Sequence, residues 1–534
     1  MFLKISGESA IENKIIDSIS YTPIHLNAKS ISDQTNLFSE KLNKIGFIEN
    51  EILEFKKIND STFFAKYKLN KKFEFIHIYI SENSQLKSAL LFKSKNDTIT
   101  IPYSEIESFL KESLSKLEKS GFALAKLKLV DIEKRKNYII AKLDLIFDNK
   151  RFLNGIVING YDKFPKGHYS NLKKIYQNKI FNQETVKQIY SVINKYRFIK
   201  QVKYPEILFT KDSTKIYVYL EKVKASTFDG FIGFSNNESK KIIFNGYLDL
   251  TLNNILNSGE NFSIFWKSDG DEQKTFNGSV ELPYVFKSRF GLKAQLNIFK
   301  QDSTFQNTKT AIDLGYFFNY NSRLYIGYQA TESSDIQNQN TATISDFNNS
   351  FITTQYEYLK TDSEEHLFPE KTKLFFKTGF GSRKSKFINN NQVYFNLDLK
   401  HEFYLNEKNR INLRSQNFYL KSEQYIINEL YRFGGINSIR GFNENSLQAN
   451  QFTSILTEYR YLINPSIYIH SIIDYVYYQD QSINRKGSLI GLGIGIGLQT
   501  KNGLFNIIYA NGSSNNEAIK SSNSIVHLSF KTIF

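Results

Sequence analysis

The chain has 534 residues, of which 41% are hydrophobic and 15% aromatic, and it has no cysteine. At roughly 150 residues per domain, this length predicts three or four units, although one large all-β domain could take up much of it. The apolar content is enough for a folded core, which excludes a disordered polycation. The lack of cysteine excludes disulfides, thiolate catalysis and cysteine-bound zinc.

The positive charge is concentrated in the N-terminal part of the chain. Residues 1–224 hold 39 Lys and Arg against 25 Asp and Glu (39 − 25 = +14), whereas residues 225–534 hold 30 against 28 (30 − 28 = +2). This asymmetry indicates that two different bodies share the chain.

A membrane-spanning helix needs roughly 18 consecutive apolar residues. The longest candidate run, Leu489–Leu498, has ten residues, and four of them are glycine. The opening residues Met1–Lys4 do not begin a secretory signal with a basic start and an apolar run. Two interpretations stay open at this point: a cytosolic chain, or a sequence that begins near a mature N-terminus, which is the one we expect.

The first 224 residues contain a repeated unit. Phe47, Phe122 and Phe198 each follow a predicted amphipathic helix, and they are 75 and 76 residues apart. The helices are expected at 30–45, 104–119 and 183–196, and each is followed by two strand-like runs. We therefore predict three β-α-α-β-β modules, at 1–70, 71–149 and 150–224, with helices on one face of a small sheet.

An open sheet edge in such a module can pair with an extended chain, although a simple spacer is an equally good interpretation. The third module is the basic one, with 15 Lys and Arg against 5 Asp and Glu in residues 151–224 (15 − 5 = +10). Its basic residues match no nucleic-acid-binding signature, so we expect no nucleic acid among its partners. Three interpretations of this charge remain: it binds anionic lipid headgroups, it binds an acidic protein, or it is simply a solvated charged face.

From about residue 227 the hydrophobic residues recur at every second position, as in a β-strand, and no longer at helical spacing. Sixteen candidate strands fill residues 225–534, which is the pattern of an antiparallel outer-membrane β-barrel, with a soluble β-sandwich as the alternative. The strands are expected to begin near residues 228, 241, 260, 273, 287, 307, 322, 350, 371, 391, 408, 452, 466, 488, 503 and 524.

The alternation also predicts which face of each strand points toward lipid and which points into the lumen. Between Gly491 and Leu498 the even positions are all aliphatic and the odd positions all glycine. One face suits lipid, and the glycine face leaves room for something packed inside the barrel. In the run from Ile455 to Ile463, Glu458 and Arg460 lie opposite the apolar face and should point into the polar lumen.

Between the eleventh and twelfth candidate strands, the segment 431–442 reads Tyr-Arg-Phe-Gly-Gly-Ile-Asn-Ser-Ile-Arg-Gly-Phe. Gly434, Gly435 and Gly441 would allow tight turns, and a lone Arg440 inside a barrel would need carboxylate partners. By alternation Glu458 and Asp474 fall on the lumen face.

This segment resembles the GG…(V/I)RGF/Y loop of the BamA/TamA superfamily, which comprises outer-membrane assembly and translocation barrels with periplasmic POTRA domains. The resemblance covers nearly the whole chain and is closest to a TamA-like architecture. It implies that the loop folds into the barrel, with Arg440, Gly441 and Phe442 locked by Glu458 and Asp474. Two departures stand out: Val476 replaces a glycine that is usual two residues after the aspartate, and the last strand lacks its usual glycine.

The resemblance implies a protein that moves polypeptides into or across an outer membrane, with residues 1–224 in the periplasm. Its implied partners are unfolded outer-membrane or secreted polypeptides, outer-membrane lipid, and accessory subunits in the periplasm or anchored as lipoproteins. A seam between the first and last strands would open laterally. The residues expected at that seam are Gly230, Gly233, Phe530 and Phe534.

Two alternatives remain, a two-partner-type secretion pore and, from another class, a passive porin. Catalysis has little support, because the seven histidines are scattered and the sequence has no zinc-protease, nucleophile-elbow or phosphate-loop motif. We expect no enzyme activity and no cofactor. His470 is expected to be a polar lumen residue and not a metal ligand.

Overall fold

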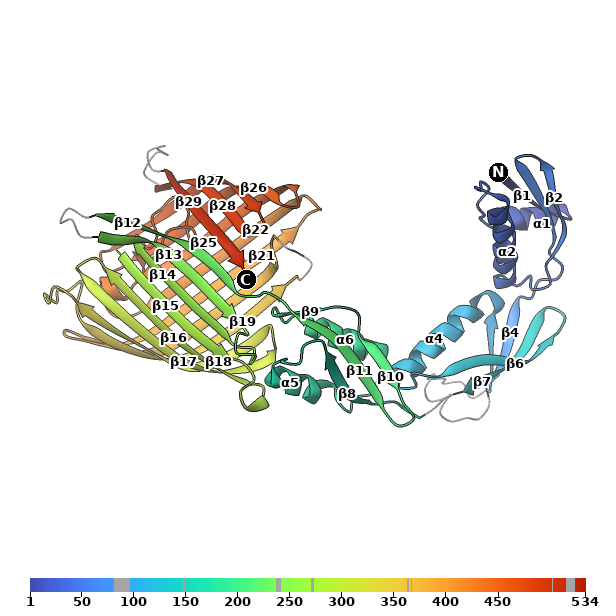
Figure 1. Cartoon of the computed structure of the whole chain (residues 1–534), viewed down its shortest axis with the longest axis horizontal. Coiled ribbons are helices and arrows are strands. Elements are labelled where there is room, and N and C mark those ends of the chain that lie inside the picture. The colour runs from blue at the N-terminus through green and yellow to red at the C-terminus, as the bar shows by residue number, and fades with distance from the viewer. Residues whose placement is uncertain are drawn as a thin grey trace. The chain divides into compact units, whose positions relative to one another are not determined.

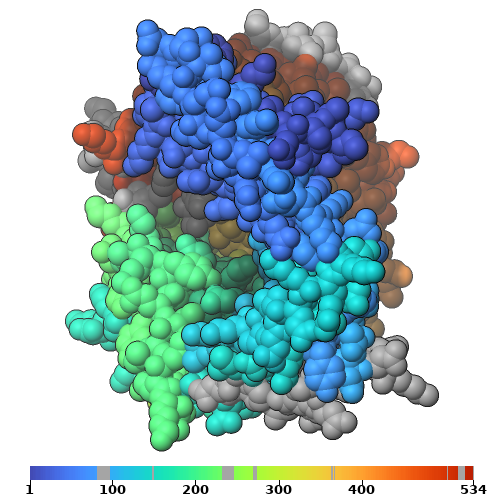
Figure 2. Space-filling model, turned by 90° about the vertical axis from the view of Figure 1, so that its right-hand side faces the viewer, coloured from blue at the N-terminus to red at the C-terminus, as the bar shows by residue number. Residues whose placement is uncertain are grey.

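The computed structural model describes residues 1–80, 97–146, 149–236, 242–269, 273–362, 365, 367–501, 503–514 and 524–534. Two compact units make up the chain. The first contains Met1–Asn154, Asn178–Lys187 and Leu208–Lys215, and the second contains Gly155–Gln177, Gln188–Ile207 and Ile216–Phe534. Residues 1–224 are coloured blue through cyan to green in the ribbon view and in the space-filling view (Figures 1 and 2). Among the described residues, no helix is both long and apolar enough to cross a bilayer.

The first module has the predicted order of elements. These are β1 (Phe2–Gly7), α1 (Ala10–Asp17), α2 (Ala28–Lys44), β2 (Glu51–Asn59) and β3 (Thr62–Lys68), with the sheet order β1-β3-β2. Helix α1 begins at a capping box of Ser9 and Glu12, and Glu12 also accepts a 2.8 Å hydrogen bond from the Leu69 N–H. Both helices pack on one sheet face because their apolar residues recur at helical spacing.

The described residues of the second module contain one helix of the two predicted for each unit. It contains β4 (Phe75–Ile80), β5 (Thr98–Pro102), the 3₁₀ turn η1 (Tyr103–Glu105), α4 (Ile106–Lys119), β6 (Lys126–Lys134) and β7 (Tyr138–Ile146), in the sheet order β5-β4-β7-β6. Strand β5 was not predicted; its Thr-Ile-Thr-Ile alternation favours an extended chain through β-branched side chains. Residues 81–96 lie outside the described residues, so the second helix expected for this module stays a prediction.

The third module consists of β8 (Leu153–Asn159), α5 (Lys166–Tyr176), α6 (Gln183–Ile193), β9 (Ile199–Gln201), β10 (Glu206–Phe209) and β11 (Thr214–Lys222). Its sheet order is β10-β11-β8, and β9 pairs with β11. Three apolar residues of α6, Val186, Ile189 and Ile193, are buried, as the helical period predicts. Phe47, Phe122 and Phe198, which mark the repeat, are all buried.

The remaining chain forms a closed barrel of sixteen antiparallel strands, which confirms the predicted fold class (Figure 1). Each strand begins within three residues of its predicted position; the start expected near 241 falls just outside the described residues. The strands are β12 (Thr227–Asn236), β13 (Ile242–Asn253), β14 (Asn261–Asp269), β15 (Gln273–Leu282), β16 (Phe290–Gln301), β17 (Phe305–Asn319), β18 (Ser322–Asp335), β19 (Phe347–Thr361), β20 (Glu370–Ser385), β21 (Asn389–Tyr404), β22 (Asn409–Lys421), β25 (Gln451–Asn464), β26 (Ile467–Asp480), β27 (Arg485–Gln499), β28 (Leu504–Ser514) and β29 (Ser524–Ile533).

The alternation along the strands sorts side chains between the two barrel faces. Leu492, Ile494, Ile496 and Leu498 of β27 are exposed on the outside, and so are alternate apolar residues of β17 to β19 and of β25. An outward apolar surface and a polar interior are the arrangement that a bilayer requires.

Candidate functional site

The loop between β22 and β25 lies inside the barrel. It starts with η3 (Ile427–Glu429) and continues as a two-stranded hairpin of β23 (Tyr431–Phe433) and β24 (Leu447–Ala449). Phe433 and Ile439 of the loop pack in one buried cluster with Phe452 of β25 and Val476 of β26. Val476, one of the two departures from the superfamily that segment 431–442 resembles, therefore adds apolar contact to the loop. We call residues 427–449 the inserted loop.

Gly434 and Gly435 turn the chain at the tip of the hairpin. Their φ angles are +109° and +96°, a region that side-chain-bearing residues rarely adopt. The Ser438 N–H donates to the Gly435 carbonyl, and the Gly435 N–H donates to the Ile439 carbonyl, both at 3.1 Å. A side chain on Gly434 would also collide with the Asn443 carbonyl. The two glycines thus place Arg440 at the end of a compact turn.

Arg440 makes a four-bond contact with the barrel wall. Its backbone N–H and its Nε donate to Asp474 Oδ2 at 3.0 and 2.8 Å, and Nη2 donates to Asp474 Oδ1 at 2.5 Å. Its Nη1 donates to Glu458. The Asp474 side chain is 0% exposed and that of Arg440 5%. The structure therefore brings together the three residues that were expected to form a lock.

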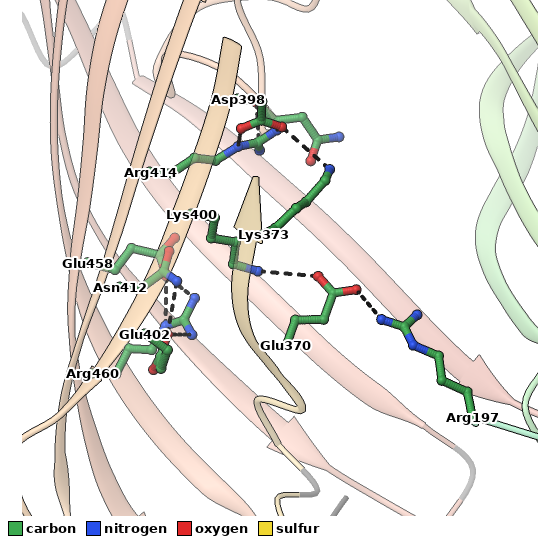
Figure 3. A network of polar contacts seen from close by, with 11 residues as sticks. Arg197, Glu370, Lys373, Asp398, Lys400, Glu402, Asn412, Arg414, Glu458 and Arg460 are labelled. Atoms are coloured by element: carbon green, nitrogen blue, oxygen red, sulfur yellow. Dashed lines mark hydrogen bonds and ion pairs between the residues drawn. The ribbon is translucent and has the colours of Figure 1, made fainter. Parts of the chain in front are cut away.

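Glu458 has a second cationic partner. Arg460 Nε and Nη2 donate to Glu458 Oε2 at 2.8 and 2.5 Å, and Arg460 Nη1 donates to Glu402 Oε2 at 2.8 Å. Asn412 donates to the same Glu402 oxygen at 2.9 Å (Figure 3). The lumen wall thus holds an alternating chain of charges, in which each buried ion has an opposite neighbour.

Small residues of the wall give the loop room to approach. A side chain on Gly491 of β27 would collide with the Arg440 carbonyl, and one on Gly441 would collide with the backbone of Gly512 on β28. A side chain on Gly512 would lie 2.6 Å from the Phe442 ring. The glycine face of β27 therefore provides the space that its sequence pattern predicted, and Phe442 packs against β28.

Two further anchors of the inserted loop were missed by the sequence analysis. Arg414 of β22 donates to both oxygens of Asp398 at 2.8 and 2.9 Å, and its Nη1 donates to the Asn437 carbonyl at 3.1 Å. Arg383 of β20 pairs with Glu429 of η3, and both side chains are almost completely buried. Charged residues at lumen-facing positions were a detectable signal, but the sequence does not show which of them meet.

The seam between the first and last strands is short. Among the described residues, β12 and β29 pair at Thr227–Ile533, Phe228–Thr532 and Asp229–Lys531, whereas β12 and β13 pair from Thr227–Thr251 to Asn236–Ile242. Phe534 exchanges backbone hydrogen bonds with Ser226 at 3.2 and 2.9 Å, and the Phe530 N–H donates to the Asp229 carboxylate at 3.2 Å. Gly230 and Gly233 lie beyond the last paired position of β12 and are paired with β13 alone.

The third module meets the barrel around His168 of α5. Its ring is completely buried, and it makes edge contacts with Tyr196 and Phe198 of the module and with Tyr284 of the turn between β15 and β16. Burial, aided by the charge of Arg323, lowers the pKa of His168 from 6.5 to about 3. Arg197 also donates to Glu370 of β20 at 3.2 Å, and Lys400 lies 3.8 Å from the same carboxylate (Figure 3).

Among the described residues, no group of three or more histidine, aspartate or glutamate side chains is arranged to hold a metal ion. His470 faces the lumen, where its Nε2 lies 3.4 Å from Asn506 Oδ1. This is the polar lumen environment that was expected for it. His366 lies outside the described residues.

The comparisons with known proteins agree with this architecture. No protein-family model and no curated protein matches the sequence. Three solved structures are similar: BamA from Haemophilus ducreyi lacking POTRA domains 1-3 (13% identity, 86% of this chain and 99% of that chain, TM-score 0.50), CdiB from Acinetobacter baumannii (13%, 86% and 89%, 0.54) and CdiB from Escherichia coli (11%, 94% and 97%, 0.53). At these identities the likeness concerns the fold.

Proposed function

We propose that this chain, which has the fold of the BamA/TamA superfamily, is an outer-membrane barrel that inserts or translocates β-rich polypeptides. Its place in the bacterial outer membrane is supported by the closed barrel and by its outward apolar face. Residues 1–224 then lie in the periplasm and receive the unfolded substrate. Outer-membrane lipid and accessory subunits in the periplasm are the other partners of this proposal.

The short seam between β12 and β29 is the observation that carries the proposal. Unpaired backbone groups in hydrocarbon cost several kcal/mol each, so a strand edge that opens toward lipid recruits another strand. Beyond Asp229 the edge of β12 is free of β29 pairing in the described residues. An incoming substrate strand can pair there, and closure of the seam then releases it.

The N-terminal modules have edges suited to delivering such a strand. In the first module β2 is an edge strand, since the sheet order is β1-β3-β2. Ile52, Phe55 and Ile58 of this strand are exposed. An extended segment could therefore add to β2 through backbone hydrogen bonds and gain apolar contact from the same residues.

A two-partner-type secretion pore is the second candidate, because the inserted loop occupies the lumen through which a secreted chain would pass. The three N-terminal modules count against it, since the resemblance assigns two to that branch. A passive porin has no need of these modules. Planar-bilayer recordings separate the candidates: large stable channels would indicate a pore, and small flickering ones an assembly factor.

A disulfide across the seam tests lateral opening directly, because the chain has no cysteine of its own. The pair Phe228→Cys and Thr532→Cys joins positions that face each other in β12 and β29. Under oxidising conditions we expect loss of insertion of an outer-membrane protein into proteoliposomes, with recovery after reduction.

The matched control is Ile352→Cys with Phe380→Cys, which joins two outward-facing residues paired across β19 and β20. This disulfide should leave insertion unchanged, because that strand pair has no opening to block. Full insertion by the oxidised seam variant would show that the seam does not gate.

A further inference from the structure

The interior of the barrel contains a cavity of about 760 Å³ beside the inserted loop. Strands β17 to β21 line one side of it, and Glu429, Tyr431 and Asn437 of the loop lie on the other. Its volume falls within the range of ligand-binding pockets, roughly 300–1,000 Å³.

Two lysines of this cavity lack the carboxylate partner that several other lumen cations have. Arg432 also lines the cavity without an ion pair among the described residues, but its guanidinium lies over the Phe299 and Phe305 rings. Lys293 pairs with Glu357 at 2.6 Å, and Lys373 lies 3.4 Å from Asp398. Lys309 of β17 and Lys377 of β20 both line the cavity, yet neither forms an ion pair within 4.0 Å in the part of the chain that the structure describes. Lys377 is 7% exposed, so its ammonium group is almost enclosed.

The surroundings of the two lysines leave positive charge in excess. They repel each other, and Asp313 attracts Lys377 without reaching ion-pair distance. The Asp313 side chain is completely buried and accepts a 3.4 Å hydrogen bond from the Thr353 hydroxyl. Among the acids that line the cavity, Glu429 already pairs with Arg383. Lys377 is enclosed and Lys309 is more exposed to the lumen, and these two ammonium groups, of which neither has a carboxylate within 4.0 Å among the described residues, favour the entry of an anion.

The polar groups around the lysines suit a peptide better than a phosphate. The Tyr394 hydroxyl donates to Gln329 Oε1 at 3.1 Å, which leaves the Gln329 amide NH₂ to donate to a ligand. Asn349 and Asn396 place two further side-chain amides on the lining of the cavity. Phe351 and Tyr394 add aromatic surface. A peptide supplies polar, apolar and carboxylate groups for these amides, rings and lysines, whereas a phosphate has no apolar surface for the rings.

We propose that Lys309 and Lys377 form a binding site for an acidic side chain of a polypeptide that enters the lumen. The lysines bind the carboxylate, and the amides of Gln329 and Asn349 hydrogen-bond to the adjoining peptide groups. This inference rests on the proposed function, because it names a feature of the transported chain. It adds a preference for acidic segments to a barrel whose contacts otherwise depend on backbone pairing.

Direct binding to the purified full-length protein in detergent micelles tests the site. The probe is a peptide of alternating Asp and Ser, acetylated and amidated at its ends, and its counterpart has Asn in place of every Asp. Calorimetry should give at least about tenfold tighter binding of the acidic peptide, as expected for a desolvated charge pair. The double variant Lys309→Gln, Lys377→Gln should lose this difference.

Two controls keep the result interpretable. Lys360→Gln removes an exposed lysine of β19 that does not line the cavity, and it should retain the difference. Lys309→Arg with Lys377→Arg keeps the charge and should restore most of the binding. Heat-modifiable migration on gels shows whether each variant contains a folded barrel, and a variant without it is replaced by the single substitution Lys309→Gln.

Equal binding of the two peptides by the folded wild-type protein would overturn the proposal. So would binding of pyrophosphate, but not of the acidic peptide, through the same lysines, because that outcome indicates a phosphate-bearing ligand. Since the assay measures binding alone, its failure would leave the seam experiment and the proposed function untouched.

Discussion

Asp474 and Glu458 bind the same arginine but differ in what else they contact. Glu458 also accepts two hydrogen bonds from Arg460, whereas the carboxylate of Asp474 forms an ion pair with Arg440 alone within the described part of the chain. Asp474 is also the more deeply buried of the two. Loss of Arg440 would therefore leave one buried carboxylate with a cation and the other without one.

We expect Arg440→Ala to destabilise the barrel by about 3–5 kcal/mol, the usual consequence of leaving a buried ion uncompensated. Guanidinium unfolding of the protein in micelles measures this loss. Adding Asp474→Asn to Arg440→Ala should recover part of the stability, because the orphaned charge is then gone. Adding Glu458→Gln should recover less, because Arg460 then loses a partner. Equal recovery by both would contradict the assignment of Asp474 as the principal partner.

At the scale of elements, the inserted loop fits because β27 and β28 present glycines where the loop approaches. Gly491 lies against the Arg440 carbonyl, and Gly512 lies against Gly441 and Phe442. Gly487 occupies the same strand as Gly491, but a side chain there would meet the Tyr478 ring at 3.4 Å, an ordinary contact distance. Gly491 and Gly487 therefore provide a test position and a control position in the same strand.

Gly491→Ala should displace the loop at a cost of about 1–3 kcal/mol, as overpacking does in a filled interior. Trypsin measures the displacement, because the peptide bond after Arg440 is shielded while that residue is buried. Cleavage at Arg440 should accelerate in Gly491→Ala and stay at the wild-type rate in Gly487→Ala. Unchanged resistance of Gly491→Ala to trypsin would contradict this prediction. It would mean that the barrel wall shifts to accommodate the added methyl group while the loop stays in place.

At the scale of the whole molecule, buried aromatic rings connect the third module to the barrel within the second unit. His168 contributes a titratable group to this contact, and both of its ring nitrogens lack hydrogen-bond partners. Its pKa of about 3 in the folded protein lies below the unfolded value of 6.5. Between these values the unfolded state binds more protons, so the stability of the contact falls as the pH falls from 6.5 toward 3.

Hydrogen exchange of α5, corrected for the intrinsic pH dependence of exchange, should show this loss between pH 6.5 and pH 4. The opening free energy should fall by up to about 1.4 kcal/mol per pH unit in this window and remain constant above it. His168→Phe should abolish the slope. His25→Gln, which removes a histidine of the first module, should keep it. A slope that persists in His168→Phe would assign the titration to another group.

Much of the fold was predictable because local patterns report local geometry. Alternation at period two placed all sixteen barrel strands, since each strand has one face toward apolar surroundings and one toward the lumen. Strand β5 was missed because the β-α-α-β-β repeat inferred for the three modules has no strand directly before its second helix. Of the site, Arg440, Glu458 and Asp474 could be named because a loop motif and two strand positions are readable in the chain.

The sequence by itself determined the barrel, the faces of its strands and the residues of the Arg440 contact, because periodicity and glycine positions depend on near neighbours. The tertiary structure decided which distant charges meet. Arg414 reaches Asn437 and Arg383 reaches Glu429 across strands that lie far apart in the chain, whereas Lys309 and Lys377 have no carboxylate within 4.0 Å among the residues that the structure describes. Strand tilt and closure set these distances, and no local pattern carries that information.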